Sequence, residues 1–126
     1  MIGTLYTSCY GRLKDGKGIK IAVSSTVPAK IIKGVHYHFW MKALAPSPEL
    51  LDSWKKKEIT WDEYLETWKD EHNKSKEAIK EFNIIIWLLK QGYDVTIYCY
   101  ESDPEYCHRK IISDNIEKRG FRVRHV

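Results

Sequence analysis

Residues 74–100, which read KSKEAIKEFNIIIWLLKQGYDVTIYCY, decide the fold class. Apolar residues recur at helical spacing through the first two thirds of this stretch, which predicts a helix over 74–91. Ile84, Trp87 and Leu88 widen the apolar stripe, so we expect this helix to be buried on more than one side.

A strand, a further helix and a closing strand follow. Gly92 suits the left-handed residue that ends a helix, and the apolar run Asp94–Tyr100 predicts a buried strand. Asp103 with Pro104 is typical of a helix start, and Gly120 of its end before a terminal strand over Phe121–Val126. This alternation indicates an α/β protein.

The first half of the chain adds two strands and two helices. Strands are predicted at Ile2–Ser8 and Ile19–Ser24, with a loop over 11–18 between them. Ser47 before Pro48 predicts a short helix to about Lys57, and the capping box Thr60-x-x-Glu63 opens a longer one. We therefore expect a small, mostly parallel sheet of about four strands with helices on its faces and a central helical insertion, in a single domain spanning residues 1–126.

Composition limits the class of protein. The 126 residues are 43% hydrophobic and 30% charged, as in an ordinary globular domain. No apolar run approaches the ~20 residues of a membrane span, and the first residues do not resemble a signal peptide. Three cysteines without an export signal make a disulfide framework improbable, so a reducing cytoplasm is the expected compartment.

Charge is distributed unevenly. The net charge is +4, but residues 1–42 carry seven basic side chains and one acid, Asp15. This segment is therefore +6 and the remainder slightly acidic. A basic lobe suits a phosphate-bearing partner, a nucleotide or nucleic acid. A solvated lysine-rich surface explains the same pattern, and both interpretations stay open.

The segment 99–109, CYESDPEYCHR, holds the densest group of reactive side chains. It lies where a buried strand ends and a helix begins, the usual place of ligand sites in open α/β sheets. A helix start also attracts anions. From strand alternation and the helical stripe we expect four of its side chains to converge at the carboxyl edge of the sheet: Cys99, Glu101, Cys107 and His108.

Three chemical interpretations compete for this segment. Cys107 near a helix start is a candidate thiolate nucleophile, assisted by His108 or Arg109. Cys99, Cys107 and His108 could instead hold a metal, although the cysteine spacing is longer than in common zinc knuckles. In the third interpretation the cysteines are small buried hydrophobes and Arg109 pairs with Glu105.

Other residues could extend the site. Cys9 lies at the same edge as Cys99 if their strands are parallel, either lining the site or simply buried; Ser8, Tyr10 and Gly11 share that edge. His36 and His38 are more typical of hydrogen-bonded side chains than of a metal pair. The chain lacks dinucleotide, nucleoside-triphosphate, zinc-protease and hydrolase fingerprints.

Two parts of the sequence carry a resemblance to a known family. Cys99-Tyr100-Glu101 and Cys107-His108-Arg109, with Asp103-Pro104 between them, resemble the C-terminal signature of the bacterial domain-of-unknown-function 488 family. Leu44-Ala45-Pro46-Ser47 resembles its shorter branch. One departure is the stretch Ser24–Pro28, where that family usually has an arginine before proline and this chain has none. The resemblance strengthens the assignment of the site and implies no particular reaction.

The sequence thus predicts an enzyme-like pocket for a nucleotide or nucleic acid. Its expected catalytic residues are Glu101 as acid or base, Cys107 as thiolate or structural thiol, and His108; its expected ligand-binding residues are Arg109 toward phosphate, Cys99, Ser8 and Tyr10. The alternatives are a non-catalytic nucleic-acid or protein-binding module in which the cluster is structural, and a metal-binding protein.

Overall fold

The computed structural model describes residues 2–100 and 108–126, without the side chain of His108. Five strands form one sheet in the order β3-β2-β4-β1-β5, and every neighbouring pair is parallel. The strands are β1 (Thr4–Cys9), β2 (Ile19–Ala22), β3 (Phe39–Trp40), β4 (Val95–Cys99) and β5 (Arg122–His125). The predicted α/β class is confirmed, with five strands where about four were expected.

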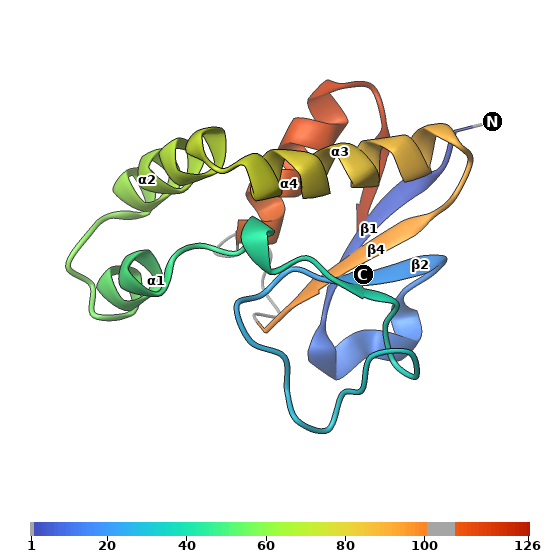
Figure 1. The fold of residues 1–126 in the computed structure, drawn as a ribbon, viewed down its shortest axis with the longest axis horizontal. Coiled ribbons are helices and arrows are strands. Elements are labelled where there is room, and N and C mark those ends of the chain that lie inside the picture. The colour runs from blue at the N-terminus through green and yellow to red at the C-terminus, as the bar shows by residue number, and fades with distance from the viewer. Residues whose placement is uncertain (1, 101–107) are drawn as a thin grey trace.

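In the described part of the chain, four α-helices and two 3-10 helices connect these strands (Figure 1). They are η1 (Tyr10–Asp15), η2 (Lys42–Leu44), α1 (Pro48–Lys55), α2 (Trp61–Lys74), α3 (Lys76–Lys90) and α4 (His108–Lys118). The central insertion is the run from η2 to α3, which separates β3 from β4. Within the described residues, no helix combines the length and the apolar character that crossing a membrane requires.

Local signals position the helices as predicted. The Ser47 hydroxyl accepts the Leu50 N–H at 3.2 Å at the start of α1. At the start of α2, Thr60 Oγ1 accepts the Glu63 N–H at 3.1 Å, and the Glu63 carboxylate accepts the Thr60 N–H at 3.0 Å. These contacts pair N–H groups that have no acceptor within the helix.

One face of the sheet, which we call the helical face, holds the main core. Leu5, Ile21 and Ile97 point to this face and are fully buried. They belong to one apolar cluster with side chains of all four α-helices, including Leu50, Trp68, Leu89 and Ile112. The α-helices therefore cover a single face of the sheet, a more one-sided arrangement than helices on both faces.

The prediction that α3 is buried on more than one side is wrong. Ile85 and Leu89 are fully buried toward the sheet, but Ile79, Ile84 and Trp87 are 47%, 38% and 56% exposed. Because the helices form one layer on one face, α3 has the sheet beneath it and solvent on its outer side. Ile84 and Trp87, which widen the apolar stripe in the sequence, therefore lie on an exposed apolar surface of α3.

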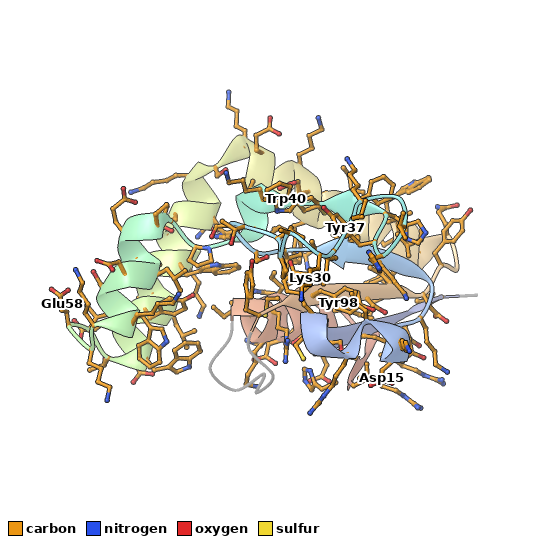
Figure 2. The ribbon with its side chains drawn as sticks, turned by 90° about the horizontal axis from the view of Figure 1, so that it is seen from below. Asp15, Lys30, Tyr37, Trp40, Glu58 and Tyr98 are labelled. Atoms are coloured by element: carbon orange, nitrogen blue, oxygen red, sulfur yellow. The ribbon has the colours of Figure 1, made fainter. Side chains whose placement is uncertain are left out.

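The opposite face of the sheet, which we call the tyrosine face, is covered by η1 and by residues 25–38 (Figure 1). Tyr10, Tyr37 and Tyr98 form a small buried cluster there with Ala22, which Figure 2 shows from below with Tyr37 and Tyr98 labelled. The Tyr98 hydroxyl donates to the Leu13 carbonyl of η1 at 3.1 Å. The segment 11–18, predicted as a loop, thus begins with 3-10 turns that are held by hydrogen bonds to β4.

Candidate functional site at the carboxyl edge of the sheet

All five described strands are parallel, so their carboxyl ends meet at one edge of the sheet. Cys9 and Cys99 are register partners in β1 and β4, as expected if these strands run parallel. The Cys9 side chain is buried and its thiol is free. Cys99 is fully buried and disulfide-bonded, so its sulfur would act as a metal ligand only after reduction.

Arg109 is the charged residue at the centre of this edge. It is the second residue of α4, and its side chain is only 2% exposed. Its Nη1 donates to the Ser8 carbonyl and lies 3.5 Å from Cys99 Sγ. A buried guanidinium is costly without such partners. Arg109 therefore fastens the start of α4 to the ends of β1 and β4.

Ser8 and Tyr10 follow each other across the end of β1. The Ser8 hydroxyl is fully buried and donates to the Arg12 carbonyl at 3.5 Å. The Tyr10 hydroxyl lies 2.5 Å from Ser24 Oγ, and burial raises the pKa of Tyr10 to about 12. Since Ser24 Oγ donates to the Thr26 carbonyl at 2.5 Å, the proton in the first contact comes from Tyr10.

Tyr100 extends these contacts to the surface. Its ring meets the Tyr10 ring edge-on, with centroids 5.0 Å apart, and its hydroxyl lies 3.1 Å from Thr26 Oγ1. The Tyr100 side chain is half exposed. We call Tyr10, Ser24, Thr26 and Tyr100 the hydroxyl cluster; it joins the ends of β1, β2 and β4 and reaches solvent.

Sequence reasoning missed three members of the hydroxyl cluster. Ser24 and Thr26 come from Ser24–Pro28, the stretch where the chain departs from the resemblance by lacking an arginine. That departure was the available signal, because a segment following a strand at the carboxyl edge can replace one polar group with others. Tyr100 belonged to the quoted signature, but it received no role.

His125 is a second residue that the sequence did not single out. It is the last residue of β5, it is exposed, and its Nδ1 is hydrogen-bonded to the buried hydroxyl of Thr7. Thr7 and His125 are register partners in β1 and β5. Its position at a carboxyl end in the final strand was the signal that could have identified it.

The remaining predicted residues are not placed by the structure. Glu101 and Cys107 lie outside the described residues, as does the side chain of His108. Over 2–100 and 108–126, no three side chains of metal-binding type gather in one place. The metal interpretation, which needs Cys107 and His108, stays a prediction.

His36 and His38, the pair weighed in the sequence, have local partners. His38 Nδ1 accepts the Lys20 N–H at 2.9 Å, and His36 Nδ1 accepts the Ile32 N–H at the same distance. His36 lies in a turn, so the two residues do not alternate along a strand. Both histidines are therefore hydrogen-bonded to the backbone, the interpretation that the sequence favoured.

Basic side chains gather on the layer that covers the tyrosine face. Exposed Arg12, Lys14 and Lys17 lie in or just after η1. In β5, Arg122 and Arg124 are register partners of Thr4 and Tyr6, so they alternate onto the same side of the sheet. The basic first third of the chain thus contributes to a surface that the last strand completes.

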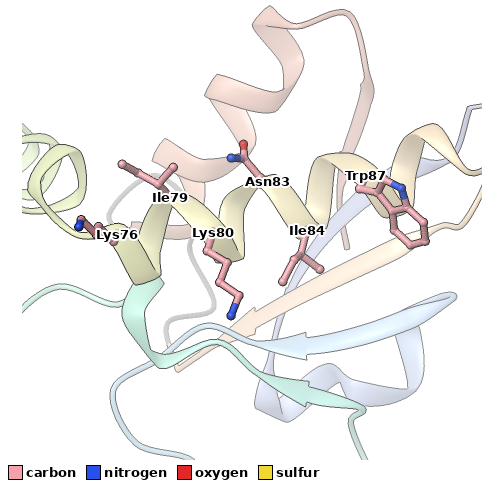
Figure 3. A pocket seen from close by; sticks show the side chains of 6 residues that line it. All are labelled: Lys76, Ile79, Lys80, Asn83, Ile84 and Trp87. Atoms are coloured by element: carbon pink, nitrogen blue, oxygen red, sulfur yellow. The ribbon is translucent and has the colours of Figure 1, made fainter.

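The helical layer holds several pockets, two of which are lined by Ile79 and Asn83 of α3. One is an open hollow of the exposed surface of α3, lined by Lys76, Ile79, Lys80, Asn83, Ile84 and Trp87 (Figure 3). The other, of about 420 Å³, lies where α2, α3 and α4 meet. Neither pocket is lined by Ser8, Tyr10, Cys99 or Arg109.

Comparison with curated proteins and with solved structures gives no match. A family model described as the Active DUF488-N3 subclade matches residues 5–120. This range spans β1 to the end of α4, including the edge at which Ser8, Tyr10 and Arg109 lie. The chain therefore belongs to the domain-of-unknown-function 488 family, in the branch described as the active DUF488-N3 subclade.

Proposed function

We propose that this chain is an enzyme that acts on a nucleotide or nucleic acid at the carboxyl edge of its sheet. The observation that carries the proposal is the buried Arg109 guanidinium, which is fastened to the ends of β1 and β4 at the same edge where the hydroxyl cluster joins the ends of β1, β2 and β4. Ligands of open parallel sheets bind at this edge. The description of the matching family branch as active also favours an enzyme.

Arg109 and the start of α4 would face the substrate phosphate. A helix start carries partial positive charge, and the guanidinium adds a full charge close to it. Because Nη1 donates to the Ser8 carbonyl, the guanidinium is held in one orientation. In this proposal Glu101 is the general acid or base, while Cys107 and His108 complete the chemistry; the three stand between Tyr100 and Arg109 in the sequence.

The Tyr100 ring is suited to stack on the nucleobase of the substrate. Its half-exposed ring is held edge-on by Tyr10 and by the contact of its hydroxyl with Thr26. Aromatic rings of this kind stack with nucleobases without regard to sequence, for about 1–3 kcal/mol per base. Tyr100 would therefore position a base while Arg109 positions the phosphate.

The experiment is a screen for product. The protein, kept reduced, is incubated with a panel of nucleotides and short oligonucleotides, and products are identified by mass spectrometry. We expect Glu101→Gln to lower the rate by at least about 100-fold, the range for a lost acid or base. Glu58→Gln, which neutralises an exposed carboxylate between α1 and α2, is the matched control. Absence of any product, or equal rates for wild type and Glu101→Gln, would overturn the proposal.

A second candidate is a non-catalytic nucleic-acid-binding module, which the basic layer on the tyrosine face favours. Arg122 and Arg124 extend the charges of η1 along the edge strand. Binding through such charges weakens steeply as salt rises. We expect Arg122→Gln/Arg124→Gln to reduce both the affinity for an oligonucleotide and its salt dependence. A flat salt response removes this candidate.

A further inference from the structure

The helical layer contains a pocket separate from the carboxyl edge. It has a volume of about 420 Å³ and lies between the end of α2, the first half of α3 and the end of α4. Arg119, which lines it, directly follows the last residue of α4 and stands ten residues after Arg109. Ten helical residues span about 15 Å, so the pocket lies well away from the site proposed above.

The walls of this pocket are basic and rich in amides. Lys69 and Arg119 contribute positive charge, and Asn73, Asn83 and Asn115 contribute carboxamides. None of the described residues that line it is acidic. The Arg119 guanidinium lies 5.1 Å from the centre of the Phe82 ring, a cation–π contact that holds the charge over an apolar surface. The pocket therefore combines cations with an aromatic wall.

Trp68, a residue of the pocket wall, holds a buried donor that has no partner among the described residues. Trp68 lines the pocket and is only 4% exposed, and its Nε1 meets no hydrogen-bond acceptor among the described residues. An indole nitrogen can only donate, and leaving a buried donor unsatisfied costs stability. An acceptor group brought by a ligand would remove that cost.

The neighbouring histidine does not fill this role. The His72 ring stacks on the Trp68 ring with centroids 3.5 Å apart. Its Nδ1 and Nε2 lie 3.1 Å from the carbonyls of Trp68 and Leu44. The ring nitrogen that carries the proton donates to one of these carbonyls, and the imidazole stays stacked on the indole.

We propose that this pocket binds a small organic anion, a phosphate or carboxylate carried on an aromatic group. The anionic oxygens would accept from Arg119, Lys69 and Trp68 Nε1, and the aromatic group would pack against Phe82. Arg119, Lys69 and Trp68 Nε1 are cations or donors, and the asparagine carboxamides can also donate, so the chemistry favours an acceptor with negative charge. This site goes beyond the proposed function, because it uses none of the residues at the carboxyl edge.

Phenyl phosphate is the probe, and benzyl alcohol is its neutral counterpart. Binding is followed through the indole N–H signals of the five tryptophans in nitrogen–proton correlation spectra, with the Trp68 signal assigned by triple-resonance experiments. We expect phenyl phosphate to shift the Trp68 signal saturably at millimolar concentrations, and benzyl alcohol to leave it in place.

Two variants of equal charge change make the test specific. Arg119→Gln should lower the affinity for phenyl phosphate about tenfold, since it removes a charge-assisted hydrogen bond. Lys118→Gln removes an exposed charge one residue away and should leave the affinity unchanged. The proposal is overturned if the Trp68 signal does not move, if benzyl alcohol moves it equally, or if both variants behave alike. Arg119→Gln should retain the nucleotide activity, so failure here is distinguishable from failure of the proposed function.

Discussion

The two faces of the sheet are covered in different ways. On the helical face, Leu5 and Ile97 pack against long helices in one large apolar cluster. On the tyrosine face, Ala22 and Tyr98 pack against Tyr10 and Tyr37, and the Tyr98 hydroxyl donates to the Leu13 carbonyl of a short 3-10 helix. Burial of aliphatic side chains stabilises a fold most per residue, whereas hydroxyls at a strand end can contact a ligand. The helical face thus stabilises the fold, and the tyrosine face continues into the hydroxyl cluster.

Adjacent residues of β4 test this comparison directly. Ile97 and Tyr98 are both fully buried, but they point to opposite faces. We expect Ile97→Ala to lower the free energy of unfolding by about 3 kcal/mol, because it leaves a cavity in the main core. Tyr98→Phe loses one hydrogen bond, to the Leu13 carbonyl, and should cost about 1 kcal/mol. Urea unfolding measures both, and equal losses would contradict the division of roles.

The same division explains which parts of the fold the sequence predicted. Helix starts depend on contacts within a few residues, so Ser47 and Thr60 identify α1 and α2 without knowledge of the rest of the chain. The two-residue strand Phe39–Trp40 has both side chains exposed and no alternation to detect. The outer surface of α3 depends on how many layers surround it, which periodicity does not report.

The sequence predicted that the candidate site lies at the carboxyl edge of the sheet, but it did not predict all of the residues that form it. Cys9 and Cys99 were expected together because parallel strands end at the same edge. The contact of Thr26 with Tyr100 depends on β2 lying next to β4, and the sequence left the strand order open. Residues far apart in the chain thus formed the hydroxyl cluster through topology, beyond the reach of local patterns.

The stability of the protein at high pH tests the contribution of the tyrosine face. Burial raises the pKa of both Tyr10 and Tyr98 to about 12, above about 10 in the unfolded chain. Their contribution to stability is complete below pH 10 and is lost as the pH rises from 10 to 12, because the unfolded chain releases these protons first. Urea unfolding at pH 8 and pH 11 should show the decrease. In Tyr10→Phe/Tyr98→Phe it should be much smaller, and an undiminished decrease would assign it to other groups.

A smaller effect is expected at the start of α2, in the helical layer. Thr60→Ala removes the acceptor of the Glu63 N–H and should lower the free energy of unfolding by about 1 kcal/mol. Thr67→Ala, at an exposed position of the same helix, should change it by less than about 0.5 kcal/mol. Thermal unfolding compares the two variants. Equal effects would show that the capping box does not stabilise α2.

The smallest effect concerns exposed charge on the two layers. Lys74 pairs with Asp70 at 3.0 Å at the end of α2, with both side chains mostly exposed. Such pairs contribute at most about 0.5 kcal/mol, so Lys74→Gln should barely change stability. If the basic layer on the tyrosine face attracts nucleic acid, Lys74→Gln should also leave oligonucleotide affinity unchanged, while Arg124→Gln reduces it. Equal losses of affinity would show that net charge, and not the face that carries it, governs binding.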